Sequence, residues 1–331
     1  MESELYTKEN SEYLLTVFCV TYNHVDTFKR AIESVLGQKT NFAFKVVVLD
    51  DASTDGTSEI VKTYSNYPNV YTVIREENSS GKNLYLGLQE LNTKYYTVLE
   101  TDDYWCDENK LQKQVDILEA NPDCSFCAHN TLEICPDTGA EHIYIKGHST
   151  KKFKFPEKLN NKNYIEPHTS SRLYCSEYLN LDKIKDSVIA TYDICNNFYF
   201  LSQGNMYYID EVMSVYNYNN KGVFSSKHPF EQRYVGASII RRLNKEFNYK
   251  YNKLLVRLFA FKLSIKGIPY LLLKYTRNPE NLDLLYEKAL KDFKEEYLNQ
   301  NYDIKPIWKF KIPYGKNKRY VLEFKREKER L

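Results

Sequence analysis

The segment FKVVVLDDASTDGT, residues 44–57, carries the strongest signal for the fold. Its first six residues, Phe44 to Leu49, form an apolar, β-branched run, which is typical of a strand buried on both faces of a sheet. Asp50 and Asp51 follow the run directly, and turn-forming residues then lead to Thr57, where a helical pattern begins. The segment therefore predicts a strand, a polar loop and a helix in succession.

The same pattern recurs on either side of this segment. Apolar runs predict further strands at Leu14–Val20, Val70–Ile74 and Tyr95–Leu99. Apolar residues at helical spacing predict helices that contain Phe28 to Leu36, Ile60 to Tyr64, and Leu111 to Leu118. Strands that alternate with helices are typical of βαβ units. The sequence thus predicts an α/β fold with a mainly parallel sheet flanked by helices.

The remainder of the chain has a different pattern. Short apolar runs predict strands at Ser125–His129, Arg172–Cys175 and Met206–Ile209, and the chain becomes helical and charged after Pro229. We therefore expect one domain over residues 1–229, divided into halves at about 12–130 and 131–229. A helical, basic C-terminal region is expected over residues 230–331.

Composition excludes several classes of protein. The best candidate for a membrane span, Leu254–Leu273, is interrupted by Arg257, Lys262, Lys266 and Pro269. The first residues are acidic and polar, so we expect no secretory signal and a cytoplasmic localisation. Seven cysteines in such a chain predict reduced thiols. Cys124 and Cys127 lie in an apolar run without a second pair at zinc spacing, which favours a structural role.

The net charge of +2 conceals an uneven distribution. Residues 305–331 carry ten Lys or Arg against three Glu, a local charge of +7 that leaves −5 for the rest of the chain. Such a tail is a candidate contact with the anionic inner face of a cell membrane.

Polar side chains follow three of the predicted strands. They are Thr21-Tyr22-Asn23, Asp50-Asp51, and Glu100-Thr101-Asp102-Asp103. The carboxyl ends of parallel strands form the ligand-binding edge of an open sheet, and carboxylates buried there are costly unless they are paired or bind a metal. In an extended segment Glu100 and Asp102 would project to one side and Asp103 to the other. Two carboxylates on one side suit Mn²⁺ or Mg²⁺, which in turn bind a diphosphate.

Two other polar residues of this edge have a simpler explanation. Ser53 and Asp55 lie just before the helix that begins near Thr57. Their residue types are typical of turns and helix caps, so we interpret them as structural.

Four motifs, in this order, resemble those of the family 2 glycosyltransferases. They are TYN at 21–23, SVLGQ at 34–38, DDASTDGT at 50–57 and ETDDYW at 100–105. The resemblance covers the first 130 residues and, more loosely, about 160–225. It implies the Rossmann-like GT-A fold, with residues 12–130 as the nucleotide-sugar-binding half and residues 131–229 as the acceptor-side half.

The resemblance also implies a set of nucleotide-sugar-binding residues. The set consists of Thr21, Tyr22, Asn23, Asp51, Lys82, Asn83, Glu100, Thr101 and Asp102. By the resemblance, Thr21 and Tyr22 line the base pocket, and Asp51 accepts a hydrogen bond from the base. Glu100 stands where many members have Asp, beside the ribose and the metal.

The metal and the general base follow from the same resemblance. Asp102 would hold Mn²⁺ or Mg²⁺, and His228 would complete the metal's coordination shell. Asp193 resembles the catalytic base of the family. Asp is also favoured at helix N-caps, so a cap for a helix at Ile194–Leu201 is the alternative for Asp193.

The resemblance implies an inverting glycosyltransferase that takes a sugar from a nucleotide diphosphate donor, of which a UDP-sugar is the first candidate. The implied acceptor is a saccharide or a lipid-linked molecule. The implied process is surface polysaccharide or glycoconjugate assembly. A sugar-phosphate nucleotidyltransferase is one alternative, but the chain has neither GxGxxG nor GxxxxGK. A non-catalytic polyanion-binding protein is another, and it explains the basic tail but not the three acidic strand ends. No nucleic acid partner is expected.

Overall fold

The computed structural model describes residues 12–135, 138–153, 165–184, 193–218 and 229–251, and short pieces beyond, chiefly 307–314 and 318–325. Contacts within the chain divide it into two units. Unit 1 comprises residues 1–158 and 165–219, and unit 2 comprises residues 159–164 and 220–331. The longer segment of unit 2 begins at residue 220, whereas the sequence predicted a C-terminal region that begins at residue 230.

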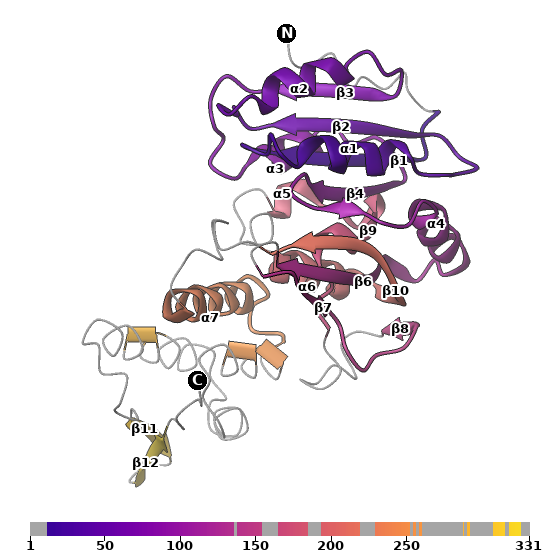
Figure 1. Ribbon diagram of the computed structural model, residues 1–331. Helices are drawn as coiled ribbons and strands as arrows, with labels where there is room; N and C mark the ends of the chain where they lie inside the picture. The colour runs from indigo at the N-terminus through magenta and orange to yellow at the C-terminus, as the bar shows by residue number, and fades with distance from the viewer. Residues whose placement is uncertain are drawn as a thin grey trace. The chain divides into compact units, whose positions relative to one another are not determined.

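Unit 1 is built on one ten-stranded sheet in the order β3-β2-β1-β4-β9-β6-β10-β5, with β7 paired to β6 and β8 to β10 (Figure 1). Its strands are β1 (Leu15–Thr21), β2 (Phe44–Asp50), β3 (Val70–Ile74), β4 (Tyr95–Glu100), β5 (Tyr104–Trp105), β6 (Cys124–Cys135), β7 (Ala140–Ile143), β8 (Lys151–Phe153), β9 (Leu173–Cys175) and β10 (Asn205–Asn217). Its helices are α1 (Phe28–Leu36), α2 (Thr57–Tyr64), α3 (Asn83–Leu88), α4 (Lys110–Ala120), α5 (Leu181–Ile184) and α6 (Asp193–Gln203).

Both faces of the central strands are covered, which explains their continuous apolar runs. On one face, Val17 and Cys19 of β1 belong to a core cluster that includes residues of α1, α2 and α4. On the other face, Phe18 packs edge-on against Tyr96, with ring centroids 6.4 Å apart, and Tyr96 packs in turn against Phe200 of α6. Alternate side chains of one strand therefore enter two separate cores.

The α/β prediction is confirmed, and the sheet is more mixed than expected. β1 pairs in parallel with β2 and β4, and β2 pairs in parallel with β3. Further along the sheet, β9 is antiparallel to both β4 and β6, and β5 is antiparallel to β10. β6 and β10 run well beyond the short strands predicted for them.

Helix α3 was not predicted from the sequence. It has only six residues, too few to show an apolar period, and it contains Gly87. A Cβ atom at Gly87 would lie 2.6 Å from Cδ1 of Leu49 in β2. The glycine therefore allows α3 to approach the sheet more closely than a larger residue would.

In unit 2, α7 (Pro229–Glu246) confirms the helix expected after Pro229. The expectation that the basic tail is helical is wrong for two of its segments. β11 (Ile307–Tyr314) and β12 (Lys318–Lys325) pair as an antiparallel hairpin. Their sequences alternate apolar and polar residues, a period of two that favours strands over helices. Among the described residues, no helix is both long and apolar enough to cross a membrane.

A buried lysine lies in the core between α4 and β5. The side chain of Lys110 is fully buried, its Nζ atom donates to Oε1 of Gln114 at 2.7 Å, and it lies 3.9 Å from the ring centroid of Trp105. Burial lowers the pKa of Lys110 to about 7. The folded protein therefore binds fewer protons than the unfolded chain between about pH 7 and the lysine's usual pKa, so stability should rise with pH over that interval.

We predict that Lys110→Met removes this contribution. Wild-type protein should gain about 2 kcal/mol of unfolding free energy from this residue between pH 7 and pH 9, because one pKa unit corresponds to about 1.4 kcal/mol. Urea unfolding at a series of pH values measures the slope. Lys29→Met, at an exposed lysine of α1, is the control. Equal slopes in the wild type and the Lys110 variant would contradict the prediction.

Candidate active site

The parallel pairing places the polar strand ends at one level. Thr21 of β1 stands opposite Asp50 of β2, and Val20 stands opposite Glu100 of β4. The carboxyl edge of the sheet therefore brings together the three segments that the sequence singled out.

The loops after β1 and β2 are joined to each other by side chains. Asn23 has a positive φ of 56°, its backbone N–H donates to Oγ of Ser53 at 2.9 Å, and its Oδ1 accepts from the N–H of Thr54 at 2.8 Å. Asparagine tolerates this left-handed backbone better than most residues. Asn23 therefore acts within the protein as a connector between the two loops.

Two acidic residues of the DDASTDGT motif are occupied by the protein itself. Oδ1 of Asp50 accepts from the N–H and the hydroxyl of Ser53, at 3.1 and 2.6 Å. Asp55 accepts from the N–H and the hydroxyl of Thr57, at 3.0 and 2.6 Å, and from the N–H of Val25 at 3.0 Å. Ser53 and Asp55 therefore have structural roles in the loop, as predicted, although the N-cap of α2 is Gly56 and not either of these two residues.

The proposed base-pocket residues differ in exposure. Tyr22 is 46% exposed, whereas Thr21 is buried and its hydroxyl has no hydrogen-bond partner. Asp51 is also buried, and its Oδ1 accepts from the N–H of Ser79 at 2.8 Å. Of these three residues, Tyr22 alone presents its side chain to solvent.

Lys82 and Asn83 are neighbours in sequence but have different surroundings. Lys82 is exposed, whereas Asn83 is buried. The amide of Asn83 donates to the carbonyl of Leu49 at 3.0 Å and accepts from Nε of Arg75 at 2.6 Å. Contact between the Asn83 side chain and a nucleotide would require these bonds to be given up. Arg75, at the end of β3, is a neighbour of this site that sequence reasoning missed.

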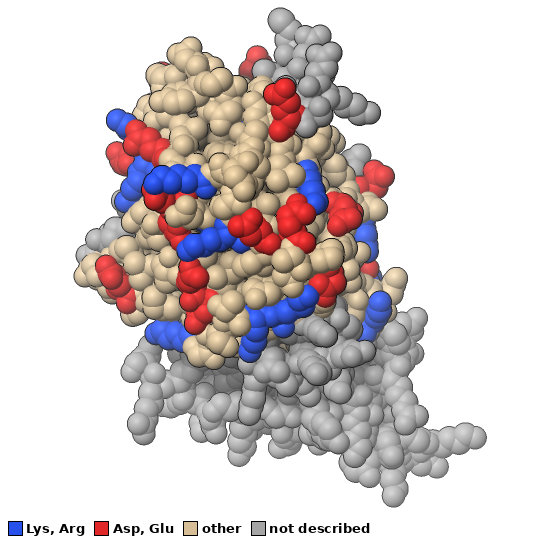
Figure 2. Space-filling model, turned by 90° about the vertical axis from the view of Figure 1, so that its right-hand side faces the viewer, with Lys and Arg blue, Asp and Glu red and all other residues tan. Residues whose placement is uncertain are grey.

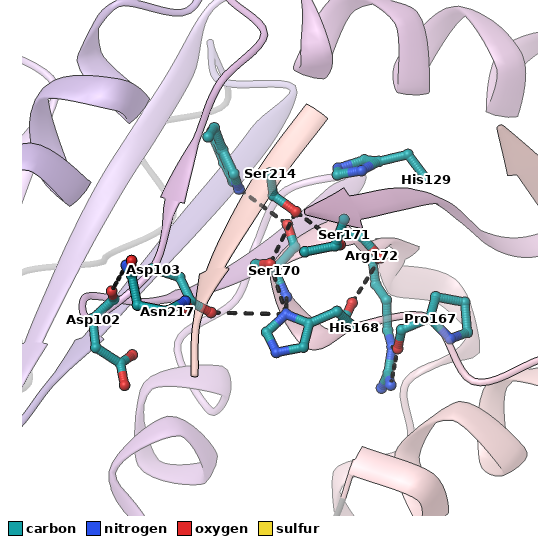
Figure 3. Close-up of polar contacts among 12 residues, drawn as sticks. Asp102, Asp103, His129, Pro167, His168, Ser170, Ser171, Arg172, Ser214 and Asn217 are labelled. Atoms are coloured by element: carbon teal, nitrogen blue, oxygen red, sulfur yellow. Dashed lines mark hydrogen bonds and ion pairs between the residues drawn. The ribbon is translucent and has the colours of Figure 1, made fainter. Parts of the chain in front are cut away.

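The acidic segment after β4 is a turn, which corrects the extended geometry assumed above. The N–H of Asp103 donates to the carbonyl of Glu100 at 3.0 Å, so the chain reverses over these residues. The turn places Asp102 and Asp103 beside Asn217, as Figure 3 shows. Thr101 is buried, and its hydroxyl lies 3.0 Å from Nδ1 of His24, so it anchors the turn.

Strand β10, from the second half of unit 1, holds this turn in place. The N–H of Asn217 donates to Oδ1 of Asp103 at 3.1 Å, and its side-chain amide donates to the carbonyl of Asp102 (Figure 3). The other oxygen of Asp103, Oδ2, lies 3.7 Å from Nδ1 of His168 and has no hydrogen-bond partner. The sequence placed Asp103 in the acidic strand end but did not predict its contact with Asn217, because these residues are 114 positions apart and meet only in the folded sheet.

Like charges dominate the electrostatics of this edge. Burial, the charge of Asp193 and the charge of Asp102 raise the pKa of Glu100 to about 8, against the opposing effect of Arg172. Burial, Asp102 and Glu100 likewise raise the pKa of Asp103. Glu100 itself lies at the solvent-exposed end of β4. Such a group of carboxylates favours a cationic partner.

The residues of the turn fit a divalent cation. Oδ1 of Asp102 is buried and has no hydrogen-bond partner. No group of three or more His, Cys, Asp or Glu residues suited to a metal occurs in the described part of the chain. The protein would thus supply one or two carboxylates, and Mg²⁺ typically completes such a site with water and substrate phosphates. His228 lies outside the described residues.

Two further residues near this edge, Asp193 and Arg172, come from the second half of unit 1. Asp193 is the exposed first residue of α6, a position that also suits the helix dipole. Arg172 is fully buried beside it, and its guanidinium donates to the carbonyl of Asp193 at 3.1 Å and to that of Pro167 at 2.9 Å. Arg172 thus fixes two loops of the site, although the sequence showed it only as the start of an apolar run.

Comparison with known proteins agrees with this arrangement. Residues 16–179, which include all three polar strand ends, match the model of glycosyl transferase family 2. The chain belongs to glycosyl transferase family 2. The matched residues contain the family motifs quoted above and end before Asp193.

Two curated relatives illustrate the sequence similarity. An uncharacterized protein of Mycobacterium tuberculosis is 27% identical over 223 residues, which is 66% of this chain and 63% of that protein. TuaG of Bacillus subtilis, named as a teichuronic acid biosynthesis glycosyltransferase, is 31% identical over 121 residues, 35% of this chain and 46% of TuaG. The family 2 chain therefore spans less than two thirds of the length of these relatives.

Solved structures share the fold of this family 2 protein. Residues 1–349 of S. aureus TarS, in complex with UDP, superpose with a TM-score of 0.60 at 17% identity, covering 95% of this chain and 99% of that one. The mannosyltransferase PcManGT of Pyrobaculum calidifontis, in complex with GDP-Man and Mn²⁺, gives a TM-score of 0.50 at 15% identity, covering 87% and 88%. At these identities the likeness establishes the GT-A fold.

We predict that Arg172→Lys destabilises the family 2 domain. A lysine cannot reproduce the forked donors that hold two carbonyl groups, and it leaves buried acceptors unpaired. The expected loss of unfolding free energy is about 2–4 kcal/mol, measured by urea unfolding. Arg30→Lys, at an exposed arginine of α1, is the control, and an unchanged midpoint in the Arg172 variant would refute this role.

Proposed function

We propose that this protein is a metal-dependent, inverting glycosyltransferase. It would transfer a sugar from a nucleoside diphosphate, with UDP as the first candidate, to a hydroxyl of a saccharide or lipid-linked acceptor. The observation that carries the proposal is the convergence of four carboxylates, Glu100, Asp102, Asp103 and Asp193, at the carboxyl edge of the sheet. The names of the relatives and the ligands of the structural neighbours support a nucleotide-sugar donor and surface polysaccharide assembly.

Two parts of the site would perform two separate tasks. Asp102 would hold Mn²⁺ or Mg²⁺, which when bound supplies positive charge next to the diphosphate of the donor. Asn217 holds the turn that carries Asp102, and Thr101 anchors the turn through its contact with His24. The donor would therefore bind at a preformed turn rather than at a mobile loop.

Asp193 would act on the acceptor. Its carboxylate takes the proton from the acceptor hydroxyl as that oxygen forms a bond to the anomeric carbon of the donor sugar. The bond from that carbon to the diphosphate breaks on the opposite side, and the diphosphate leaves with the bonding electrons. A single displacement of this kind inverts the anomeric configuration.

The alternatives have less support. A nucleotidyltransferase is disfavoured by the family match and by the absence of a glycine-rich phosphate loop. A polyanion-binding protein needs a basic surface, whereas the described residues of the face in Figure 2 intersperse acidic and basic side chains. Ion pairs such as Lys39–Glu108 and Lys94–Glu119 also neutralise exposed lysines of unit 1.

We predict that Asp102→Asn weakens metal-dependent binding of the donor. The substitution removes the charge of a buried carboxylate oxygen that has no protein partner, so affinity for UDP in the presence of Mn²⁺ should fall at least tenfold. Calorimetric titration of UDP with and without Mn²⁺ measures it, and Asp116→Asn in α4 is the control. Full transfer activity in EDTA would exclude the metal-dependent mechanism.

We predict that Asp193→Asn affects turnover rather than binding. Loss of a general base typically costs 10²–10⁴-fold, so kcat should fall by about that factor while UDP affinity stays near that of the wild type. The product's anomeric configuration, determined by NMR, should be opposite to that of the donor. Near-normal turnover by a folded variant would make Asp193 a helix-terminal residue only, and retention of configuration would overturn the inverting mechanism.

A further inference from the structure

Three aromatic rings from separate segments meet beside the carboxylates. They belong to Tyr144, just after β7, His168, just before β9, and Tyr216, near the end of β10. The rings of His168 and Tyr216 are stacked, with centroids 4.3 Å apart and planes 29° apart. Tyr144 meets both edge-on, at 5.4 and 6.5 Å. We refer to these three residues as the aromatic wall.

The inner part of the aromatic wall is held rigidly. Nδ1 of His168 lies 2.8 Å from the hydroxyl of Ser170, which donates to the hydroxyl of Ser214 in β10 at 3.1 Å (Figure 3). The N–H of Tyr144 donates to the carbonyl of Thr131 in β6 at 2.9 Å. The wall is therefore fixed to the same strands that position the acidic turn.

The aromatic wall lies between the turn that carries Asp102, the proposed metal ligand, and Asp193, the proposed base. Tyr216 precedes Asn217, whose bonds hold Asp102 and Asp103. On the other side, burial, Glu166 and Asp193 raise the pKa of Tyr144 to about 12, against the effect of Arg172. The contacts agree, because Tyr144 packs on His168, and Arg172 donates both to the carbonyl of Pro167, the residue before His168, and to that of Asp193, the proposed base.

Tyr144 differs from the other two rings because it is 39% exposed. Among the described residues, the exposed large hydrophobic side chains are Tyr22, Tyr67, Ile143 and Tyr144. Tyr22 belongs to the proposed base pocket. Tyr67 follows α2 and stacks on Tyr64, the last residue of that helix, with ring centroids 5.6 Å apart. Tyr67 leads into β3, which is at the opposite end of the sheet order from β10. An exposed ring beside carboxylates presents a flat apolar face next to strong hydrogen-bond acceptors.

This combination matches the surface of a pyranose ring. Such a ring has a face of C–H groups, which packs on an aromatic face, and a rim of hydroxyls, which donate to carboxylates. We propose that Tyr144, supported by His168 and Tyr216, is the acceptor subsite and that it takes a cyclic sugar by stacking. This inference rests on the proposed function and makes it more specific, because an open-chain polyol has no such face.

The test compares acceptors and variants together. Methyl pyranosides and an alditol with the same number of carbons serve as acceptors, with a nucleotide-sugar donor. Tyr144→Ala should raise the KM for pyranosides about 3- to 10-fold and leave donor affinity unchanged, whereas Tyr144→Phe, which keeps the ring, should resemble the wild type. Tyr67→Ala, at a similarly exposed tyrosine, is the control.

A binding measurement does not depend on turnover. Saturation-transfer NMR with the same methyl pyranosides should show strongest contact at the C–H groups of one ring face in wild type and Tyr144→Phe, and loss of contact in Tyr144→Ala. Equal contact in all three variants would overturn the subsite, as would an equal loss in the Phe and Ala variants. Contact without transfer of any sugar would instead overturn the proposed function and leave the subsite standing.

Discussion

The structure depends on the parallel register of β1 with β2 and β4. This register sets the ends of three strands at one level, so that Thr21, Asp50 and Glu100 begin their loops at the same edge. Each strand is covered on both faces, and a one-residue slip would exchange its two cores. The apolar packing of the interior therefore positions the polar groups of the edge to within a residue.

The cost of this arrangement is electrostatic. Several carboxylates lie close enough to raise the pKa of Glu100 and Asp103, so the edge favours positive charge. The guanidinium of Arg172 supplies part of this positive charge from within the protein. A cationic ligand would supply the remainder. The acids of the DDASTDGT motif contribute differently, because Asp50 and Asp55 use their oxygens to shape loops and helix starts. The acidic residues at this edge thus form two groups. Asp50 and Asp55 bond to the protein itself, whereas Asp102 and Asp103 each keep one oxygen without a hydrogen-bond partner.

The second half of unit 1, from β6 onward, contributes residues to the site. β9 joins β4 to β6 through antiparallel pairing. β10 pairs in parallel with β6 and contacts the acidic turn through Asn217. Arg172, His168 and Tyr216 all lie on or beside these strands, so residues from both halves of unit 1 meet at one edge of the sheet. The 3.7 Å distance between Oδ2 of Asp103 and Nδ1 of His168 is one such meeting.

The sequence by itself determined the longer strands of the central sheet, the main helices and the acidic edge, because apolar periodicity and strand-end chemistry are local patterns. It also indicated structural roles for Ser53 and Asp55, since turn preferences are local as well. It missed α3, the short strands β5, β7 and β8, the strands in the tail, and the turn that brings Asp103 back toward Glu100. Only the tertiary structure decided the contacts of Asn217, Arg172 and Tyr144, because their partners are distant in sequence and meet only once the sheet has formed.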